Sequence, residues 1–86
     1  MEFLIIAFKS KEESVKLSRI LSRYNVDSVL TSPPKEAGLS CGISVKTAVS
    51  NFYAVKSAIN LYDFKTFVGV FKVDTFAGRN VVKTIY

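Results

Sequence analysis

Cys41 is the only cysteine of the 86-residue chain and the side chain with the most scope for chemistry. It lies in the stretch SPPKEAGLSCGISVKT, which also holds both prolines and two of the four glycines. The thiolate is the reactive form of cysteine, and nearby cations or backbone amides favour it. Lys35 supplies a cation in the same loop, and Gly42 lets backbone amides approach an anionic sulfur closely. The stretch therefore predicts a candidate thiol site.

The absence of histidine excludes several kinds of catalysis within the chain. Neither a Ser-His-Asp triad nor a Cys-His pair can form. One cysteine without histidine provides no thiolate and imidazole ligand set for zinc. There is no phosphate-binding glycine-rich loop, no dinucleotide-binding fingerprint and no carboxylate pair spaced for acid-base catalysis. We therefore expect no metal and no cofactor, and a carrier or binding protein rather than an enzyme with independent turnover.

Charge and hydropathy favour a cytoplasmic protein that binds neither nucleic acid nor membrane. Twelve Lys and Arg residues against seven Asp and Glu residues give a formal charge of +5, but the basic residues are scattered. A nucleic-acid partner would favour a clustered basic patch. A single cysteine cannot form an intrachain disulfide, which suits a reducing cytosol. The apolar run Phe3–Phe8 is far shorter than the ~20 residues that span a bilayer, and Glu2 precedes it instead of a basic signal-peptide start.

Apolar periodicity predicts the elements that must position Cys41. Continuous apolar sequence over Phe3–Phe8 is typical of a strand buried on both faces. Ser10 and Glu13 have the spacing of a helix capping box. The predicted strands are Phe3–Phe8, Asp27–Thr31, Cys41–Lys46 and Thr66–Val73, and the predicted helices are Lys11–Tyr24 and Ala48–Leu61. The tail provides an extra C-terminal strand, Val81–Ile85.

A long loop separates the second and third predicted strands. Pro33 and Pro34 lack N–H donors, so residues 32–40 cannot form regular structure. After the loop, Ser44 and Lys46 alternate with apolar residues, which indicates a strand with one buried face and one solvent-facing side.

The order of the elements predicts an α+β fold. The order β-α-β-β-α-β is that of the ferredoxin-like split β-α-β sandwich. Right-handed crossovers would place the first and third strands side by side in the centre of an antiparallel sheet, with both helices on one face. Residues 1–86 then form a single domain.

The predicted topology also gives the loop a position. We expect the second strand to run antiparallel to both the first and the third, which places the loop at the sheet edge where the first strand begins. No helix amino terminus lies at that edge to favour a thiolate. Arg79 and Lys83, in the tail, are expected to fold back towards Cys41 and Lys35.

A structural role for Cys41 is the main alternative. Free cysteines are among the most buried residue types and often act as small hydrophobes. The protein is then a ligand- or protein-binding regulatory module that homodimerises through an exposed sheet face or through the tail strand. The sheet lacks the basic and aromatic pattern of RNA-recognition strands, so RNA is the weakest ligand class.

The segment PPKEAGLSCGISVK resembles the hallmark of the selenium/sulfur carrier-like family, which consists of small single-domain bacterial proteins. The family motif is a Thr-Pro-Arg triplet, a short serine-rich stretch, and Ser-Cys-Gly opening an apolar strand. The matching positions are Pro34, Ser40, Cys41 and Gly42. The departures are Pro33 in place of Thr, Lys35 in place of Arg, and Gly38 and Leu39 within the serine-rich stretch.

The resemblance implies a carrier role. Cys41 would accept sulfur from a persulfide, or selenium, from a donor protein and pass it to an acceptor. Lys35 would support the anionic sulfur. The candidate binding residues come from the loop and from the tail: Pro34, Lys35, Ser40, Gly42, Arg79 and Lys83.

Overall fold

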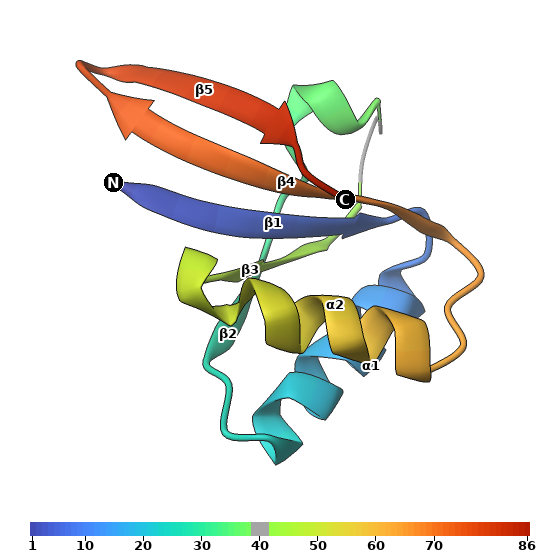
Figure 1. The fold of residues 1–86 in the computed structure, drawn as a ribbon. Helices are drawn as coiled ribbons and strands as arrows, with labels where there is room; N and C mark the ends of the chain where they lie inside the picture. The colour runs from blue at the N-terminus through green and yellow to red at the C-terminus, as the bar shows by residue number, and fades with distance from the viewer. Residues whose placement is uncertain (39–41) are drawn as a thin grey trace.

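The structure, a computed structural model, describes residues 1–38 and 42–86. Within these residues the strands are β1 (Glu2–Phe8), β2 (Ser28–Thr31), β3 (Ser44–Thr47), β4 (Phe67–Phe76) and β5 (Arg79–Thr84). The helices are α1 (Lys11–Arg23) and α2 (Phe52–Leu61), with short 3₁₀ helices η1 (Lys35–Ala37) and η2 (Val49–Asn51). The strands form one antiparallel sheet in the order β2-β3-β1-β4-β5 (Figure 1). The predicted α+β class is confirmed.

Strand β1 is the centre of the fold. Its residues from Leu4 to Phe8 are each at most 4% exposed, and it pairs with β3 on one side and with β4 on the other. Successive side chains of a strand point to opposite faces, so burial of every residue means that both faces are covered. The prediction of a strand buried on both faces is confirmed.

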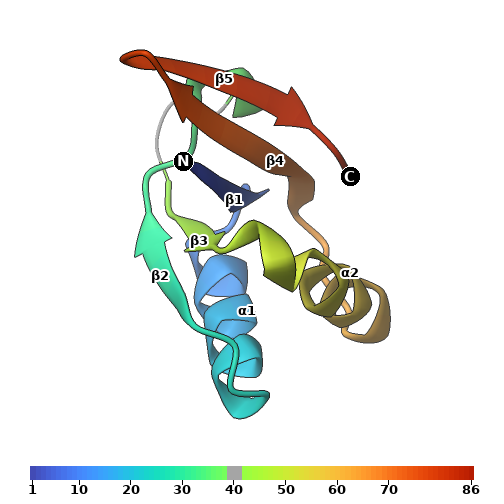
Figure 2. The same ribbon diagram turned by 60° about the vertical axis from the view of Figure 1, so that its left-hand side comes forward.

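Both helices pack on one face of the sheet (Figures 1 and 2). Leu4, Ile6 and Phe8 of β1 form one apolar cluster with Leu17 of α1 and Val55 of α2. Burial of each such side chain contributes about 1.5–3 kcal/mol. Neither described helix is long and apolar enough to cross a membrane.

The opposite face of the sheet is covered without a long helix. Its buried cluster consists of Ile5, Ala7, Phe71 and Val73. Ala37 of η1 and Val82 of β5 pack against this cluster, and η1 lies on the side of the sheet away from α1 and α2 (Figures 1 and 2). The proline-containing loop and the β4–β5 hairpin therefore cover the second face.

Helix α1 begins directly after Ser10, as predicted. The Ser10 hydroxyl accepts the N–H of Glu13 at 3.4 Å and so caps the helix. The Glu13 carboxylate does not complete a capping box. It accepts backbone N–H groups of Lys65 at 2.8 Å and of Thr66 at 2.7 Å, together with the Thr66 hydroxyl. Glu13 thus ties the start of α1 to the segment that leads into β4.

The predicted direction of the second strand was wrong. Strands β1 and β2 are both antiparallel to β3, so they run parallel to each other. A crossover helix returns the chain to the edge from which the first strand started, and parallel strands result. The loop after β2 therefore leaves the sheet at the edge where β1 ends and α1 begins.

Several predicted boundaries also move. The prediction that residues 32–40 form no regular structure was wrong for Lys35–Ala37, which form η1; Pro34 lies before its first turn, where no N–H donor is needed. Strand β3 begins at Ser44 rather than at Cys41, and α2 begins at Phe52, after η2. Strand β4 continues to Phe76, where a two-residue turn leads into β5 at Arg79. The extra C-terminal strand is confirmed, with a start earlier than the sequence indicated.

Replacement of Glu13 by alanine should lower the free energy of unfolding by about 2 kcal/mol at pH 7, because hydrogen bonds to an ionised carboxylate are lost. Burial raises the pKa of Glu13, but hydrogen bonds from the Thr66 hydroxyl and from the Lys65 and Thr66 backbone outweigh it and hold the pKa below the usual 4.5. A lowered folded-state pKa stabilises the protein above the unfolded-state pKa, and this stabilisation is lost as pH falls through the folded-state value. Urea unfolding should therefore show a larger deficit for Glu13→Ala at pH 7 than at pH 3.

Asp63→Asn is the matched control, because it removes a carboxylate charge from an exposed residue. It should change the free energy of unfolding by less than about 0.5 kcal/mol. A Glu13→Ala deficit of the same size at both pH values would contradict the proposed role of the ionised carboxylate.

Candidate functional site

The loop between β2 and β3 is anchored to the amino-terminal part of α1. Ser14 of α1 is fully buried, and its hydroxyl donates to the backbone carbonyl of Ile43. This bond fixes the arm of the loop that enters β3. The same sheet edge carries the start of α1, where the helix dipole is a source of positive potential. The expectation that no helix amino terminus lies at this edge was wrong, because it rested on the wrong direction for β2.

A hollow of about 400 Å³, here called the loop hollow, lies between the loop, the helix-free sheet face and β5. The apolar side chains that line it are Phe3, Ile5, Val73 and Val82. The other lining residues are Thr31, Ser32, Pro34, Lys35, Lys46 and Asn80. Apolar walls with a few polar groups are typical of a site for a small ligand.

Two lysines give the loop hollow a positive character. Lys46 lies opposite Ile5 in the β1–β3 ladder, and its Nζ is 4.3 Å from the centre of the Phe3 ring. A cation over an aromatic face is held in place while its charge is retained. Lys35 is exposed in η1. None of the described side chains that line the hollow is acidic, so the site suits an anionic group.

Two glycines shape the loop on either side of residues 39–41. Gly38 ends η1 with φ 71°, and Gly42 has φ 145°. Residues with a Cβ rarely adopt these values. Among residues 1–38 and 42–86, a Cβ at either position would meet no atom within 4 Å, so the need for glycine there is conformational rather than steric. Both glycines therefore have backbone conformations that favour glycine.

The structure brings together part of the predicted site. Pro34 and Lys35 line the loop hollow, and Gly42 lies just before β3. Ser40 and Cys41 lie outside the described residues, so their roles stay predictions.

The tail cations lie apart from the loop hollow. In β5, Lys83 is opposite Lys72 of β4, which is itself opposite Leu4 of β1. Leu4 belongs to the helix-side cluster, and residues opposite each other in a ladder share a face. Lys83 therefore faces the helix side, where it lines a separate hollow of about 240 Å³. Arg79 lies four residues earlier in the same strand, so its side chain is on the same face of the sheet as that of Lys83.

Asn80, Lys46 and Ser44 lie at or beside the loop hollow and were not selected from the sequence. Asn80 follows Arg79, and a step of one residue along a strand reverses the face. Lys46 and Ser44 were interpreted as the solvent-facing side of β3. Ser44 is fully buried opposite Thr31, and its Oγ has no hydrogen-bond partner among residues 1–38 and 42–86. The alternation of polar and apolar residues along β3 places Ser44 and Lys46 on one face of the strand. It does not indicate that a loop covers this face.

The chain matches a known family over most of its length. The model of the family described as "Putative Se/S carrier protein-like" matches residues 3–66. The match begins in β1 and ends just before β4, so it includes the whole loop between β2 and β3. No curated protein and no solved structure matches the chain.

Replacement of Gly42 by alanine should lower the free energy of unfolding by about 1–3 kcal/mol, the usual cost of a strained backbone conformation. The cost comes from φ, because the added methyl group would meet none of the residues that the structure describes within 4 Å. Thermal or urea unfolding of the purified variant measures the loss.

Gly69→Ala is the control, since Gly69 has no positive φ and a Cβ there would lie 3.6 Å from the Phe71 ring, an ordinary contact. We expect a smaller loss for Gly69→Ala. Equal stability of Gly42→Ala and wild type would show that the loop relaxes freely to another conformation.

Proposed function

The chain belongs to the Se/S carrier protein-like family, and from that premise we propose that it carries sulfur or selenium on the thiol of Cys41. The observation that carries the proposal is the family match over residues 3–66, which spans the only cysteine of the chain. The loop hollow supports it, because Lys35 and Lys46 supply positive charge beside the same loop. Neighbouring cations favour a thiolate over a thiol.

In the proposed reaction, the Cys41 thiolate attacks the terminal sulfur of a persulfide on a donor protein. The bond between the two donor sulfurs breaks, and the donor leaves as a thiolate with the electron pair of that bond. The proton stays on the transferred sulfur, so Cys41 becomes a persulfide. A nucleophile of the acceptor then takes the terminal sulfur and restores the Cys41 thiolate. Atoms and charge balance in both steps, and neither step needs an oxidant or a reductant.

Each neighbouring residue has a role in this proposal. Lys35 and Lys46 stabilise the thiolate and the persulfide anion by charge. Gly42 gives the backbone the freedom to turn amides towards the sulfur, and Pro34 restricts the entrance of the loop. A reducing cytoplasm is the compartment that suits a free thiol carrier.

We also infer a ferredoxin-like core with β5 as an additional strand. The order β2-β3-β1-β4 within an antiparallel sheet supports this assignment. So does the position of both helices on one face (Figure 2). The long β2–β3 loop is then the feature that distinguishes this chain from a minimal β-α-β-β-α-β unit.

The loop hollow favours a second candidate function, which is reversible binding of a small anionic ligand with Cys41 in a structural role. Its volume of about 400 Å³ is within the range of small-molecule sites. Lys35 and Lys46 would bind a carboxylate or phosphate, and Asn80 would add hydrogen bonds. Such a module would form a homodimer only through surfaces other than the loop hollow, because the ligand occupies the hollow.

Incubation with a cysteine desulfurase and ³⁵S-cysteine tests the carrier role. Wild type should acquire label that a reducing agent removes, and Cys41→Ala should acquire none. Lys46→Gln should slow labelling about two- to tenfold, because a cation near the sulfur is lost. Lys65→Gln removes the same charge at an exposed position before β4 and should label at the wild-type rate.

Equal labelling of wild type and Cys41→Ala would refute the carrier role. The second candidate is then tested separately, by titrating Cys41→Ala with inorganic phosphate and with acetate. Saturable binding that is lost in Lys46→Gln would favour the ligand-binding module.

A further inference from the structure

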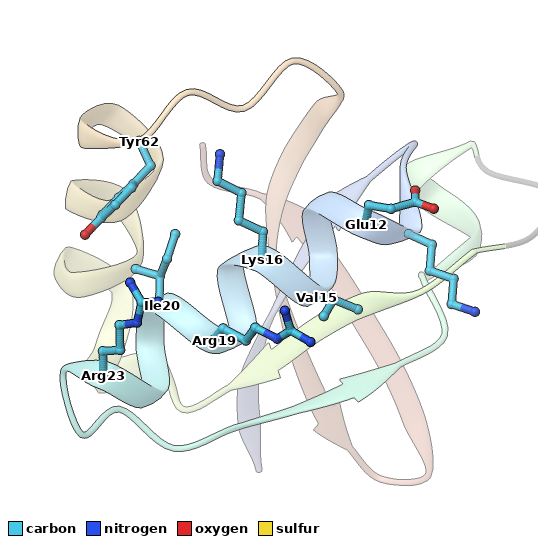
Figure 3. A pocket seen from close by; sticks show the side chains of 8 residues that line it. Glu12, Val15, Lys16, Arg19, Ile20, Arg23 and Tyr62 are labelled. Atoms are coloured by element: carbon cyan, nitrogen blue, oxygen red, sulfur yellow. The ribbon is translucent and has the colours of Figure 1, made fainter.

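The outer face of α1 carries cations that form no ion pair with a carboxylate of the described residues. Lys11, Arg19 and Arg23 line a hollow of about 570 Å³, here called the basic hollow. Figure 3 shows Arg19 and Arg23 projecting from α1, with Tyr62 approaching from the end of α2. The ion pairs among the described residues join the amino terminus to Asp74 and Lys72 to Glu2. Within the described part of the chain, these three cations therefore lie beyond 4.0 Å of any carboxylate oxygen.

The other charged residues of the basic hollow are already engaged. Lys16 donates to the carbonyl of Asp63 at 2.9 Å, and its Nζ lies 4.8 Å from the centre of the Phe64 ring. Glu12 is the acidic residue of the lining, and its carboxylate accepts the Ser10 hydroxyl at 2.9 Å. It lies in the first turn of α1, where the helix dipole favours negative charge. Arg19 and Arg23, further along the helix, remain available to a partner.

An apolar groove of about 340 Å³ adjoins the basic hollow between α1 and α2. Ala54, Ser57 and Ala58 are the small side chains of α2 that line it, and Leu61, which is 74% exposed, lies beside them. Residues three and four apart share one face of a helix, so these small side chains form one surface into which larger side chains can pack.

The two hollows form a continuous surface. Tyr62 lines both of them, and its hydroxyl lies 3.2 Å from the hydroxyl of Tyr24, which lines the apolar groove. Arg23 directly precedes Tyr24 in the chain. Arg19 and Arg23 thus lie beside a groove that is lined by small side chains and by larger apolar ones.

We propose that this surface binds an amphipathic, acidic α-helix of a partner protein. The apolar side of such a helix packs in the groove, and its carboxylates pair with Arg19 and Arg23. Grooves that bind helices use this arrangement of apolar anchors and complementary charge. A nucleic acid would use the cations but leave the groove of small apolar residues unfilled. An anionic bilayer would favour protruding apolar side chains rather than a hollow.

The proposal is independent of the carrier role. The docking surface lies on the helix layer, whereas the loop hollow lies on the opposite face of the sheet. A bound helix would leave the loop hollow open. Binding measured with Cys41→Ala separates the two proposals, because this variant should bind the helix as wild type does.

The test uses a fluorescein-labelled, stapled helical peptide of about 14 residues, which at 1.5 Å per residue is about as long as α1. Leucines occupy one face and glutamates the neighbouring positions. Fluorescence anisotropy should show saturable micromolar binding, and the same peptide with Gln for Glu should bind about tenfold more weakly. Arg19→Glu with Arg23→Glu should weaken binding of the acidic peptide at least about tenfold.

Arg79→Glu with Lys83→Glu is the control for general electrostatics, because it changes the net charge by the same amount on β5. It should change the affinity less than about twofold. Amide chemical shifts should move at the carboxyl-terminal half of α1 and on α2. No saturable binding, equal weakening by both double variants, or shifts at the loop hollow would overturn the proposal. So would tighter binding of a single-stranded DNA or of phosphatidylserine vesicles at the same salt concentration.

Discussion

Burial of β1 on both of its faces is the constraint from which the rest of the structure follows. The strand has no polar side between Leu4 and Phe8, so it needs a cover above and a cover below. Right-handed crossovers send both helices to one face. The other face then depends on whatever chain remains, which is the long loop after β2 and the hairpin of β4 and β5. Packing of the sheet therefore requires the loop to lie on this face, whatever function the loop has.

That requirement explains why the loop hollow forms beside the family motif. Ala37 packs against the buried cluster while Pro34 and Lys35, earlier in the loop, line the space next to it. The hydrogen bond from Ser14 to Ile43 holds the other arm of the loop to α1. The two described arms of the loop are thus held in place, one by packing on the sheet and the other by a hydrogen bond to α1.

Local patterns predicted the elements well, and non-local geometry accounts for the errors. The apolar run Phe3–Phe8 and the Ser10 cap are properties of adjacent residues, so the sequence contains them. The direction of β2 is an exception, because a β-α-β crossover makes β1 and β2 parallel and the order of the elements already contains this information. The choice between Arg79 and Asn80 as a site residue depends on strand register, which the turn at Ala77 and Gly78 sets with positive φ at both positions. Burial of Ser44 could not be predicted, because it depends on a loop folding over the sheet.

The asymmetry between the two faces has a consequence for how the protein can work. Chemistry at the motif loop needs close access for small reacting groups, whereas selective recognition of a partner needs area. One face of a small domain has little surface for both an accessible reaction site and a partner-binding area. Here the helix layer provides the unpaired cations and the apolar groove, and the opposite face provides the hollow beside the loop. A partner held on the helix layer would raise the local concentration of its own reactive group without covering the hollow. The division of faces that β1 imposes therefore separates the proposed docking surface from the proposed site of transfer.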